Sequence, residues 1–376
     1  IFANAITAHA AEINDFCPSA FVQPGPPIVS TVFAIGELMK ASGEEILRAM
    51  IAGYEIACRF PKALGLSNLE TAGLSSHGIG PTFGAAAAAA SLLKMHPEQI
   101  QYVLAYCVQQ AAGSFNWIRD DDHVEKAFLF AGMPARNGAM AALLVHHGFT
   151  GVKDPFAGSP NWFFSSIFIG PDSDLDKEKL VRNLGMDFEL PLVGYKRYSV
   201  GGPAQPGVEG LLTLIQRVNR QEVVEVIVKM PGRPDVFREA AMPALNLPYL
   251  AAVILEDGDL TFDSAQSHER LATPSIRGKM KKVTLLHDPS QEREVRVESA
   301  IVEIVLKNGS RESIFIEHVL GFPERPMDRS DVEAKALGLI IPIVGTDKAK
   351  KLVDTMRHLE EVQDIQTIVP LLLPED

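Results

Sequence analysis

Two adjacent cations, Lys196 and Arg197, stand in a stretch without acidic residues, 194–207, although the whole chain carries a formal net charge of −12. Glycine and proline are frequent in this stretch, which predicts a tight loop with an accessible backbone rather than a helix face. An arginine can hold a carboxylate with two parallel hydrogen bonds. The loop is therefore a candidate site for a small anion such as a carboxylate. The alternative is a solvated basic turn whose acidic partners lie elsewhere in the fold.

A histidine, His77, lies in a polar, glycine-punctuated stretch, residues 75–84, that leads into a run of alanines. We predict a loop ahead of an alanine-rich helix, whose first backbone N–H groups favour a bound anion. An imidazole with an unperturbed pKa of about 6.5 can exchange a proton at neutral pH. His77 is therefore a candidate acid or base. The alternative is a loop histidine that is hydrogen-bonded to the backbone.

Polar residues also cluster near the start of the chain. His9, Glu12 and Asp15 are spaced three residues apart, which places them close to one helix face. The segment then breaks into a loop that contains Gln23 and Pro24. Such a cluster could orient an acid or a base, whereas the alternative is an N-terminal helix that faces water.

Lys126 follows three consecutive aspartates, residues 120–122, and adds another candidate cation. We predict no metal at these aspartates, because Ca²⁺ loops take ligands from alternating positions around a glycine turn. A surface lysine in a salt bridge is the alternative for Lys126. The sequence contains no P-loop, no G-x-G-x-x-G between a strand and a helix, no G-x-S-x-G, no H-E-x-x-H and no C-x-x-C. We therefore expect no cofactor, no zinc and no serine hydrolase chemistry.

The elements that must position these residues change in type along the chain. Helical periodicity dominates residues 1–192 and returns at about residue 328. Between them, β-branched runs predict strands, and Asn308-Gly309 is a strong hairpin signal. We predict a mainly α protein in which an all-helical domain, 1–192, is interrupted by a smaller α+β lid domain with an antiparallel sheet, 193–327. C-terminal helices, 328–376, should then pack back on the helical domain.

Local signals predict the limits of individual helices. A helix over residues 44–60 should stop at Pro61, because proline lacks a backbone N–H. Another should begin at Ser330-Asp-Val-Glu333, which has the sequence of a capping box. The chain also begins without methionine and within a helical pattern, so we expect a natural N-terminal segment to be missing.

Composition limits the class of protein. At 376 residues, with 47% hydrophobic and 22% charged residues, the chain reads as an ordinary globular protein. Its acidic balance argues against nucleic acid as the main partner. Cys17, Cys58 and Cys107 have no paired metal spacing, so we expect reduced, buried thiols and a cytoplasmic location. No run of about 20 apolar residues occurs, so no membrane span is expected.

The order of these segments resembles the MmgE/PrpD family, which includes 2-methylcitrate dehydratase, cis-aconitate decarboxylase and iminodisuccinate epimerase. The resemblance spans nearly the whole chain and rests on the following places: residues 4–15 with Gly53-Tyr54-Glu55, residues 77–93, residues 125–138 with 148–151, residues 196–198, and residues 246–253. It implies a helical domain interrupted by a lid, a homodimer, and a metal-free site between the domains. It also implies that the substrates are small di- or tricarboxylates.

The resemblance assigns roles to individual positions. Glu12 and Asp15 correspond to the acidic cluster of the family's site, and His77 corresponds to its catalytic histidine. Lys126 and Lys196 correspond to its two lysines. Tyr249 corresponds to a tyrosine that follows the lid lysine.

The chain also departs from the family's pattern. Gln23 stands where a histidine commonly precedes proline, and Phe16 follows Asp15 directly. Gln205 lies near the place of a second histidine, and an amide cannot act as a proton-transfer acid or base at neutral pH. This chain therefore offers no proton-transfer group at that place for a mechanism that needs the second histidine.

Residues and resemblance together predict a cofactor-independent lyase for a small polycarboxylate. Lys126 and Lys196, helped by Arg197 and Gln23, would hold the carboxylates. His77 would move the proton α to one of them, with Asp15 or Glu12 as its partner, and Tyr249 would hydrogen-bond the leaving group. An epimerase or isomerase is the nearest alternative, since it needs no leaving-group acid. An inactive carboxylate-binding protein is the third.

Overall fold

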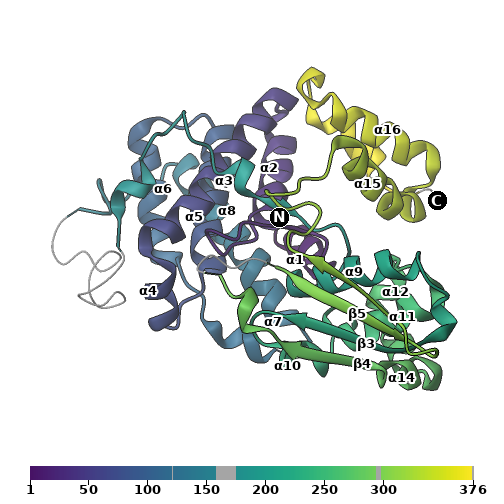
Figure 1. The fold of residues 1–376 in the computed structure, drawn as a ribbon. Helices are drawn as coiled ribbons and strands as arrows, with labels where there is room; N and C mark the ends of the chain where they lie inside the picture. The colour runs from purple at the N-terminus through teal and green to yellow at the C-terminus, as the bar shows by residue number, and fades with distance from the viewer. Residues whose placement is uncertain (121, 158–174, 294–297, 375–376) are drawn as a thin grey trace.

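The computed structural model describes residues 1–120, 122–157, 175–293 and 298–374. The predicted fold class is confirmed, because the chain is mainly α-helical and carries a smaller sheet in its second half. Figure 1 shows the early helices gathered on one side and the sheet with its helices on another, with α1 and the N-terminus between them. The last helices, in yellow, lie beside both groups.

The first part of the chain forms the helical domain. Its helices are α1 (Phe2–Ala10), α2 (Gly25–Met39), α3 (Gly43–Leu64), α4 (Leu66–Thr71), α5 (Ser76–Leu92), α6 (Pro97–Gln110), α7 (Val124–Ala127) and α8 (Met133–His146). A π-helical turn, Phe128–Gly132, joins α7 to α8. A capping box fixes the start of α3, where Ser42 and Glu45 exchange side-chain and backbone hydrogen bonds.

The alanine-rich helix α5 lies at the centre of this domain and packs against both α3 and α8. Glycines make the approach possible, because a Cβ at Gly80 would lie 2.3 Å from the Ala57 carbonyl oxygen of α3. A Cβ at Gly138 of α8 would lie 2.4 Å from the Thr82 carbonyl oxygen of α5. Small residues on three helices therefore let α5 pack closely against α3 and α8, and this packing fixes the position of His77.

Two predicted helix limits differ from the structure. Residues 76–84, which we predicted as a loop, form the first turns of α5, with Pro81 inside the helix. Helix α3 continues through Pro61 to Leu64 instead of stopping. Ala63 and Leu64 are both buried there, so packing offsets the backbone hydrogen bond that proline cannot make.

The lid contains a sheet with the strand order β4-β3-β5-β6. Its strands are β3 (Val223–Met230), β4 (Val283–His287), β5 (Ala300–Leu306) and β6 (Arg311–Ile316). The sheet is mixed rather than wholly antiparallel, because β4 runs parallel to β3 after a helical crossover. The surrounding helices are α9 (Gln205–Ile215), α10 (Pro234–Arg238), α11 (Leu247–Asp257), α12 (Phe262–Gln266), α13 (His268–Ala272) and α14 (Pro274–Met280).

The chain ends in α15 (Arg329–Val344), α16 (Thr346–Arg357) and a 3₁₀ helix, Ile365–Leu371. The N-cap of α15 is Asp328, whose carboxylate accepts a hydrogen bond from the Asp331 N–H at 2.8 Å, and not the predicted Ser330. Leu352, Ile365 and Ile368 are buried in the same core as α2 and α3. The last helices therefore add to the core of the helical domain.

One helical run, Val124–His146, is long and apolar enough to cross a membrane by length and composition. However, 72% of its apolar window is buried inside the protein, and a central core helix of a globular domain meets the same criterion.

Candidate functional site

Residues 11–16, here called the clasp segment, lie between the helical domain and the lid. Within it, β1 (Asp15–Phe16) pairs antiparallel with β2 (Gly194–Tyr195), just before Lys196. Gln266 of α12 donates a hydrogen bond to the Ala11 carbonyl at 3.2 Å. The segment is therefore fixed from the lid side by both backbone and side-chain contacts.

The clasp segment presents Glu12 to two lysines. Lys126 Nζ lies 2.5 Å from Glu12 Oε1, and Lys196 Nζ lies 2.6 Å from Glu12 Oε2. All three side chains are buried, and Lys196 also donates to Asn14 Oδ1 at 3.3 Å. Glu12 itself adopts a left-handed backbone conformation with φ 52°, which is uncommon for a residue other than glycine. Such strain persists where the surroundings impose it, and functional sites are enriched in it.

The charges in this triad influence one another. Burial alone would raise the pKa of Glu12, but the ammonium groups of Lys126 and Lys196 outweigh it and hold that pKa well below the usual range. Burial lowers the pKa of Lys196, and the Glu12 carboxylate opposes the shift. With all three groups charged, the triad carries a net charge of +1 inside the protein. Asp15 lies near Lys196 and its carboxylate, when ionised, balances part of this charge. A buried cation whose charge is only partly balanced is costly, so the triad favours a bound anion.

Asp15 is held by neutral donors next to this triad. The Tyr54 hydroxyl of α3 donates to Asp15 Oδ2 at 2.7 Å, and the Gly25 N–H at the start of α2 donates to Oδ1 at 2.9 Å. Burial raises the pKa of Asp15, although both hydrogen bonds favour its ionised form. A Cβ at Gly25 would lie 2.7 Å from Asp15 Oδ1, so this close approach needs a glycine.

His77 is buried among aromatic rings at the start of α5. Its ring stacks on Phe130 with centroids 3.7 Å apart, and the Phe21 ring lies 4.9 Å away. Phe130 lies in the π-helical turn, and Lys126 Nζ lies 5.7 Å from the centre of its ring. Phe130 therefore joins the histidine to the charged triad. π-helical turns inside α-helices are frequent at functional sites.

His9 of α1 contacts the same phenyl ring in an edge-to-face arrangement, with centroids 5.1 Å apart. Burial lowers the pKa of His9 to about 3, so the imidazole is neutral at physiological pH. Gln23 lies near this ring. Among the described residues, no group lies in hydrogen-bonding geometry to either ring nitrogen of His9 or to Gln23 Oε1. Buried polar atoms without partners are rare, and a ligand or water commonly satisfies them.

Two of the predicted positions, Arg197 and Tyr249, lie outside this cluster, and so does Gln205, which stands near the place of the family's second histidine. Arg197 pairs with Asp331 of α15 at 3.3 Å, and its side chain is 37% exposed. Tyr249 is buried in the core of the lid, where its hydroxyl donates to the carbonyl oxygens of Ser264 and Ser267. Gln205 holds the backbone that follows Lys196, since its amide group bonds Tyr198 and Val200.

The aspartates before Lys126 have a structural contact of their own. The Asp120 carboxylate accepts a hydrogen bond from the Lys126 N–H at 2.8 Å, at the start of α7, and Asp121 lies outside the described residues.

Sequence reasoning missed Phe130 and Lys335. Lys335 of α15 donates to the carbonyl oxygens of Ile13, at 2.8 Å, and of Lys196. Burial and the nearby Lys196 lower the pKa of Lys335 to about 8.

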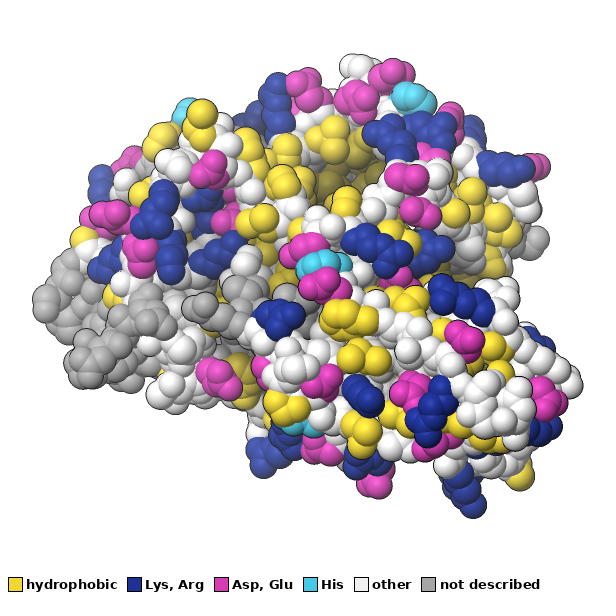
Figure 2. All heavy atoms as spheres, viewed as in Figure 1, with side chains coloured by type: hydrophobic (Ala, Val, Ile, Leu, Met, Phe, Trp, Pro, Cys, Tyr) yellow, Lys and Arg dark blue, Asp and Glu magenta, His cyan; other side chains and the backbone are white. Residues whose placement is uncertain are grey.

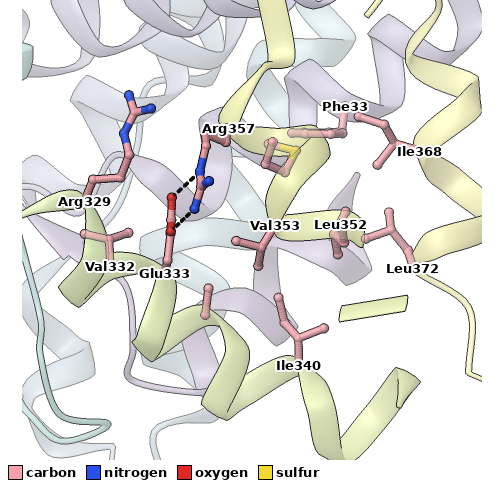
Figure 3. A pocket seen from close by; sticks show the side chains of 12 residues that line it. Phe33, Arg329, Val332, Glu333, Ile340, Leu352, Val353, Arg357, Ile368 and Leu372 are labelled. Atoms are coloured by element: carbon pink, nitrogen blue, oxygen red, sulfur yellow. Dashed lines mark hydrogen bonds and ion pairs between the residues drawn. The ribbon is translucent and has the colours of Figure 1, made fainter. Parts of the chain in front are cut away.

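A cavity of about 400 Å³ lies elsewhere, between the C-terminal helices and α2. Figure 2 shows hydrophobic side chains gathered in a hollow near the top of the view, and Figure 3 shows mostly apolar side chains around this cavity, among them Phe33, Ile340 and Leu352. Arg357, at its edge, is paired with Glu333. A small polyanion would find few polar partners there, so the buried triad is the better candidate site.

Two comparisons with known proteins bear on this site. Residues 1–175 match the model of the MmgE/PrpD N-terminal domain, and residues 198–361 match that of the MmgE/PrpD C-terminal domain. The chain is 21% identical to a cis-aconitate decarboxylase-like protein, oryM, of Aspergillus oryzae, over 97% of this chain and 80% of the relative. It is 23% identical to a cis-aconitate decarboxylase of Aspergillus terreus, over 98% of this chain and 80% of the relative. The triad takes Glu12 and Lys126 from the first matched region, and Lys196 lies just before the second.

Proposed function

We propose that this chain, which belongs to the MmgE/PrpD family, is a lyase that acts on a small di- or tricarboxylate without a cofactor. The reaction is a dehydration or a decarboxylation in which a proton moves at the carbon α to a carboxylate. The distant relatives named for decarboxylation of cis-aconitate support this reaction class. A decarboxylation and a dehydration share the need to stabilise negative charge next to a carboxylate.

The observation that carries the proposal is the pair of buried ammonium groups on either side of Glu12. Each ammonium has three N–H donors. Lys126 uses one on Glu12, and Lys196 uses one on Glu12 and one on Asn14. The remaining donors can bind substrate carboxylates, while Glu12 keeps the two cations at a fixed separation. In a buried site, such fixed cations stabilise an enolate-like charge more strongly than they would in water.

His77 is the proposed proton carrier. It removes the α proton in a dehydration, or returns a proton to the carbanion that loss of CO₂ leaves. Phe130 and Phe21 both pack against its ring, which limits its rotation. His9 is neutral, so it can donate a hydrogen bond to an uncharged part of the substrate or accept one from it. We give Asp15 the role of orienting the clasp segment and Tyr249 the role of supporting the lid.

The first test combines a substrate panel with a variant of the proton carrier. Purified protein is incubated with cis-aconitate and other small di- and tricarboxylates, and NMR detects a new olefin or the loss of CO₂. His77→Asn should reduce kcat by about 10²–10⁴-fold, the usual contribution of one positioned acid or base. His147→Asn, at an exposed position, should leave kcat unchanged. Full turnover by His77→Asn would remove His77 from the mechanism.

An epimerase is the second candidate, because Gln205 is fully occupied by backbone groups and no second histidine is supplied at its position. Incubation in heavy water separates the two reactions. Solvent deuterium in recovered substrate, without olefin or CO₂, would favour epimerisation. Binding of the panel in a thermal-shift assay without any conversion would instead favour an inactive carboxylate-binding protein.

We further propose that the protein is a cytoplasmic homodimer that needs neither metal, membrane nor nucleic acid. Light scattering during gel filtration should then give twice the mass of the chain. Dialysis against EDTA should leave activity unchanged, because the proposed charge stabilisation comes from lysines. A loss that Zn²⁺ or Mg²⁺ restores would contradict the metal-free mechanism.

A further inference from the structure

Two cysteines that are far apart in sequence meet behind the clasp segment. Cys17 follows β1 directly, and Cys58 lies in α3, one turn after Tyr54. Both are buried, and the Cys17 Sγ, the Cys58 Sγ and a Glu189 carboxylate oxygen lie within 4.8 Å of one another. We propose that Cys17 and Cys58 form an oxidisable dithiol, which hydroperoxides convert to a disulfide.

The charges around the pair favour thiol chemistry over a metal ion. The carboxylate of Glu189 is already paired with the Lys62 ammonium, and Lys62 also acts on Cys17. A divalent cation would have to displace or adjoin this ammonium, whereas a thiolate is attracted by it. The neighbouring Cys58 thiol, with smaller effects from Ser19 and Lys62, outweighs burial and lowers the pKa of Cys17 to about 7. Cys17 lies in the loop that a backbone bridge closes at Val22, whereas Cys58 lies within α3, so we place the nucleophile at Cys17 and the resolving thiol at Cys58.

The chemical steps balance with one hydroperoxide. The Cys17 thiolate attacks an oxygen of ROOH, the O–O bond breaks, and the alkoxide takes up a proton to leave as ROH. Cys17 is then a sulfenic acid. The Cys58 sulfur attacks the Cys17 sulfur, the S–S bond forms, and the hydroxyl group leaves as water with the Cys58 proton. The two thiols lose two electrons in total, and the peroxide gains them.

The position of this bond ties it to the candidate site. Asp15 precedes Cys17 by two residues, and Tyr54, four residues before Cys58, holds the Asp15 carboxylate at 2.7 Å. A disulfide would covalently join the end of the clasp segment to α3 just behind this hydrogen bond. A backbone bridge from Cys17 to Val22 closes the loop that carries the proposed nucleophile.

Thiol counting tests the proposal without reference to activity. The reduced protein is treated with H₂O₂, denatured, and titrated with Ellman's reagent. The wild type should fall from three thiols to one, and a peptide that joins Cys17 to Cys58 should appear by mass spectrometry. Cys107→Ser is the matched control and should fall from two thiols to none, because it retains only the pair. In the wild type the third thiol should survive, because burial raises the pKa of Cys107 and keeps it unreactive. Cys58→Ser should trap the sulfenic acid at Cys17, which dimedone labels.

Three results would overturn the proposal: retention of all three thiols, loss of Cys107 before the pair, or a linked peptide in Cys17→Ser. Stoichiometric zinc that protects two thiols and is removed by EDTA would show a metal site in place of the dithiol. The effect on catalysis rests on the proposed function and is measured separately. Oxidised protein should show altered kcat that dithiothreitol restores, and Cys17→Ser should show no such change with peroxide. If no substrate is found, the thiol count and the linked peptide still decide whether the dithiol exists.

Discussion

At the scale of single residues, Glu12 is the position on which the site depends most. Its carboxylate lies between two buried ammonium groups, so its loss leaves two like charges facing each other without water. Removing one partner from a buried ion pair typically costs about 3–5 kcal/mol, whereas exposed pairs contribute about 0–1 kcal/mol. Replacing a carboxylate with an amide should therefore reduce the free energy of unfolding more in the buried triad than in an exposed ion pair.

Glu12→Gln should reduce the free energy of unfolding by about 3–5 kcal/mol and weaken the hold on Lys126 and Lys196. Glu44→Gln is the control, since Glu44 pairs with Arg48 at 2.5 Å on the surface. Urea unfolding followed by circular dichroism measures both. Equally small losses of stability in the two variants would show that the buried positions of Lys126 and Lys196 do not depend on Glu12.

A second prediction concerns His9, whose pKa burial lowers from 6.5 to about 3. Below pH 6.5 the unfolded chain gains a proton that the folded chain refuses, so stability falls as pH decreases from about 6.5 towards 3. Between pH 6.5 and pH 5 this one group should cost about 2 kcal/mol. His9→Asn should show a shallower loss over this range. An unchanged pH slope in urea unfolding would show that His9 is protonated in the folded protein.

The sequence predicted which charged residues form the site better than it predicted which other side chains pack next to them. Lys196 was found because it lies in a stretch without acidic residues, and Lys126 was found as a further cation that the family resemblance also marks. Both reach Glu12. Phe130 and Lys335 could not be found in this way, because a phenylalanine in an apolar run and a helical lysine are ordinary in most proteins. Their importance depends on which side chains the fold brings near them.

At the scale of elements, α5 sets the position of His77 through contacts between backbones. Gly80 and Gly84 of α5 face carbonyl oxygens of α3, at distances that leave no room for a methyl group. A backbone oxygen cannot rotate away as a side chain can. Added atoms should therefore push the two helices apart.

Gly80→Ala should destabilise the protein by about 1–3 kcal/mol, the usual cost of overpacking, and reduce activity through movement of His77. Gly338→Ala, in α15, is the matched control because no atom lies within 4 Å of its Cβ position. That substitution should stabilise by about 0.5–1 kcal/mol, since alanine loses less entropy in a helix. Denaturant midpoints of both variants test the difference. A stabilised Gly80→Ala would show that α3 and α5 can separate without cost.

Periodicity and cap signals predicted most elements, including the hairpin at Asn308-Gly309. They failed where tertiary packing overrides local preference. Pro61 was expected to end α3, and the stretch 76–84 was expected to stay open, yet both are helical where these two helices touch. A one-dimensional pattern carries no information on which neighbour will cover a segment. The parallel pairing of β4 with β3 was missed for the same reason.

At the scale of the whole molecule, three distant parts of the chain meet at the clasp segment. Lys126 comes from the helical domain, Lys196 from the edge of the lid, and Lys335 from the C-terminal helices. Lys335 binds carbonyl oxygens on both sides, at Ile13 and at Lys196. It therefore links the N-terminal region to the lid.

Lys335→Met should raise KM for the carboxylate substrate about tenfold, which corresponds to about 1.4 kcal/mol of binding, with a smaller effect on kcat. The reason is that the clasp segment and Lys196 lose a shared donor. Lys350→Met, at an exposed position of α16, is the control. In the wild type, KM should also rise above about pH 8, where Lys335 loses its proton. A KM that is flat with pH and equal in both variants would contradict this role.

The π-helical turn at Phe128–Gly132 has a consequence for how the site could change in evolution. It holds one residue more than a regular turn, and successive residues of an α-helix are about 100° apart around the axis. Deleting one residue from this turn would restore regular α-helical winding. Lys126 would then rotate by about 100° around the helix axis, while α8 would keep its contacts with α5. One small genetic event would thus withdraw a cation from the triad and leave the scaffold whole.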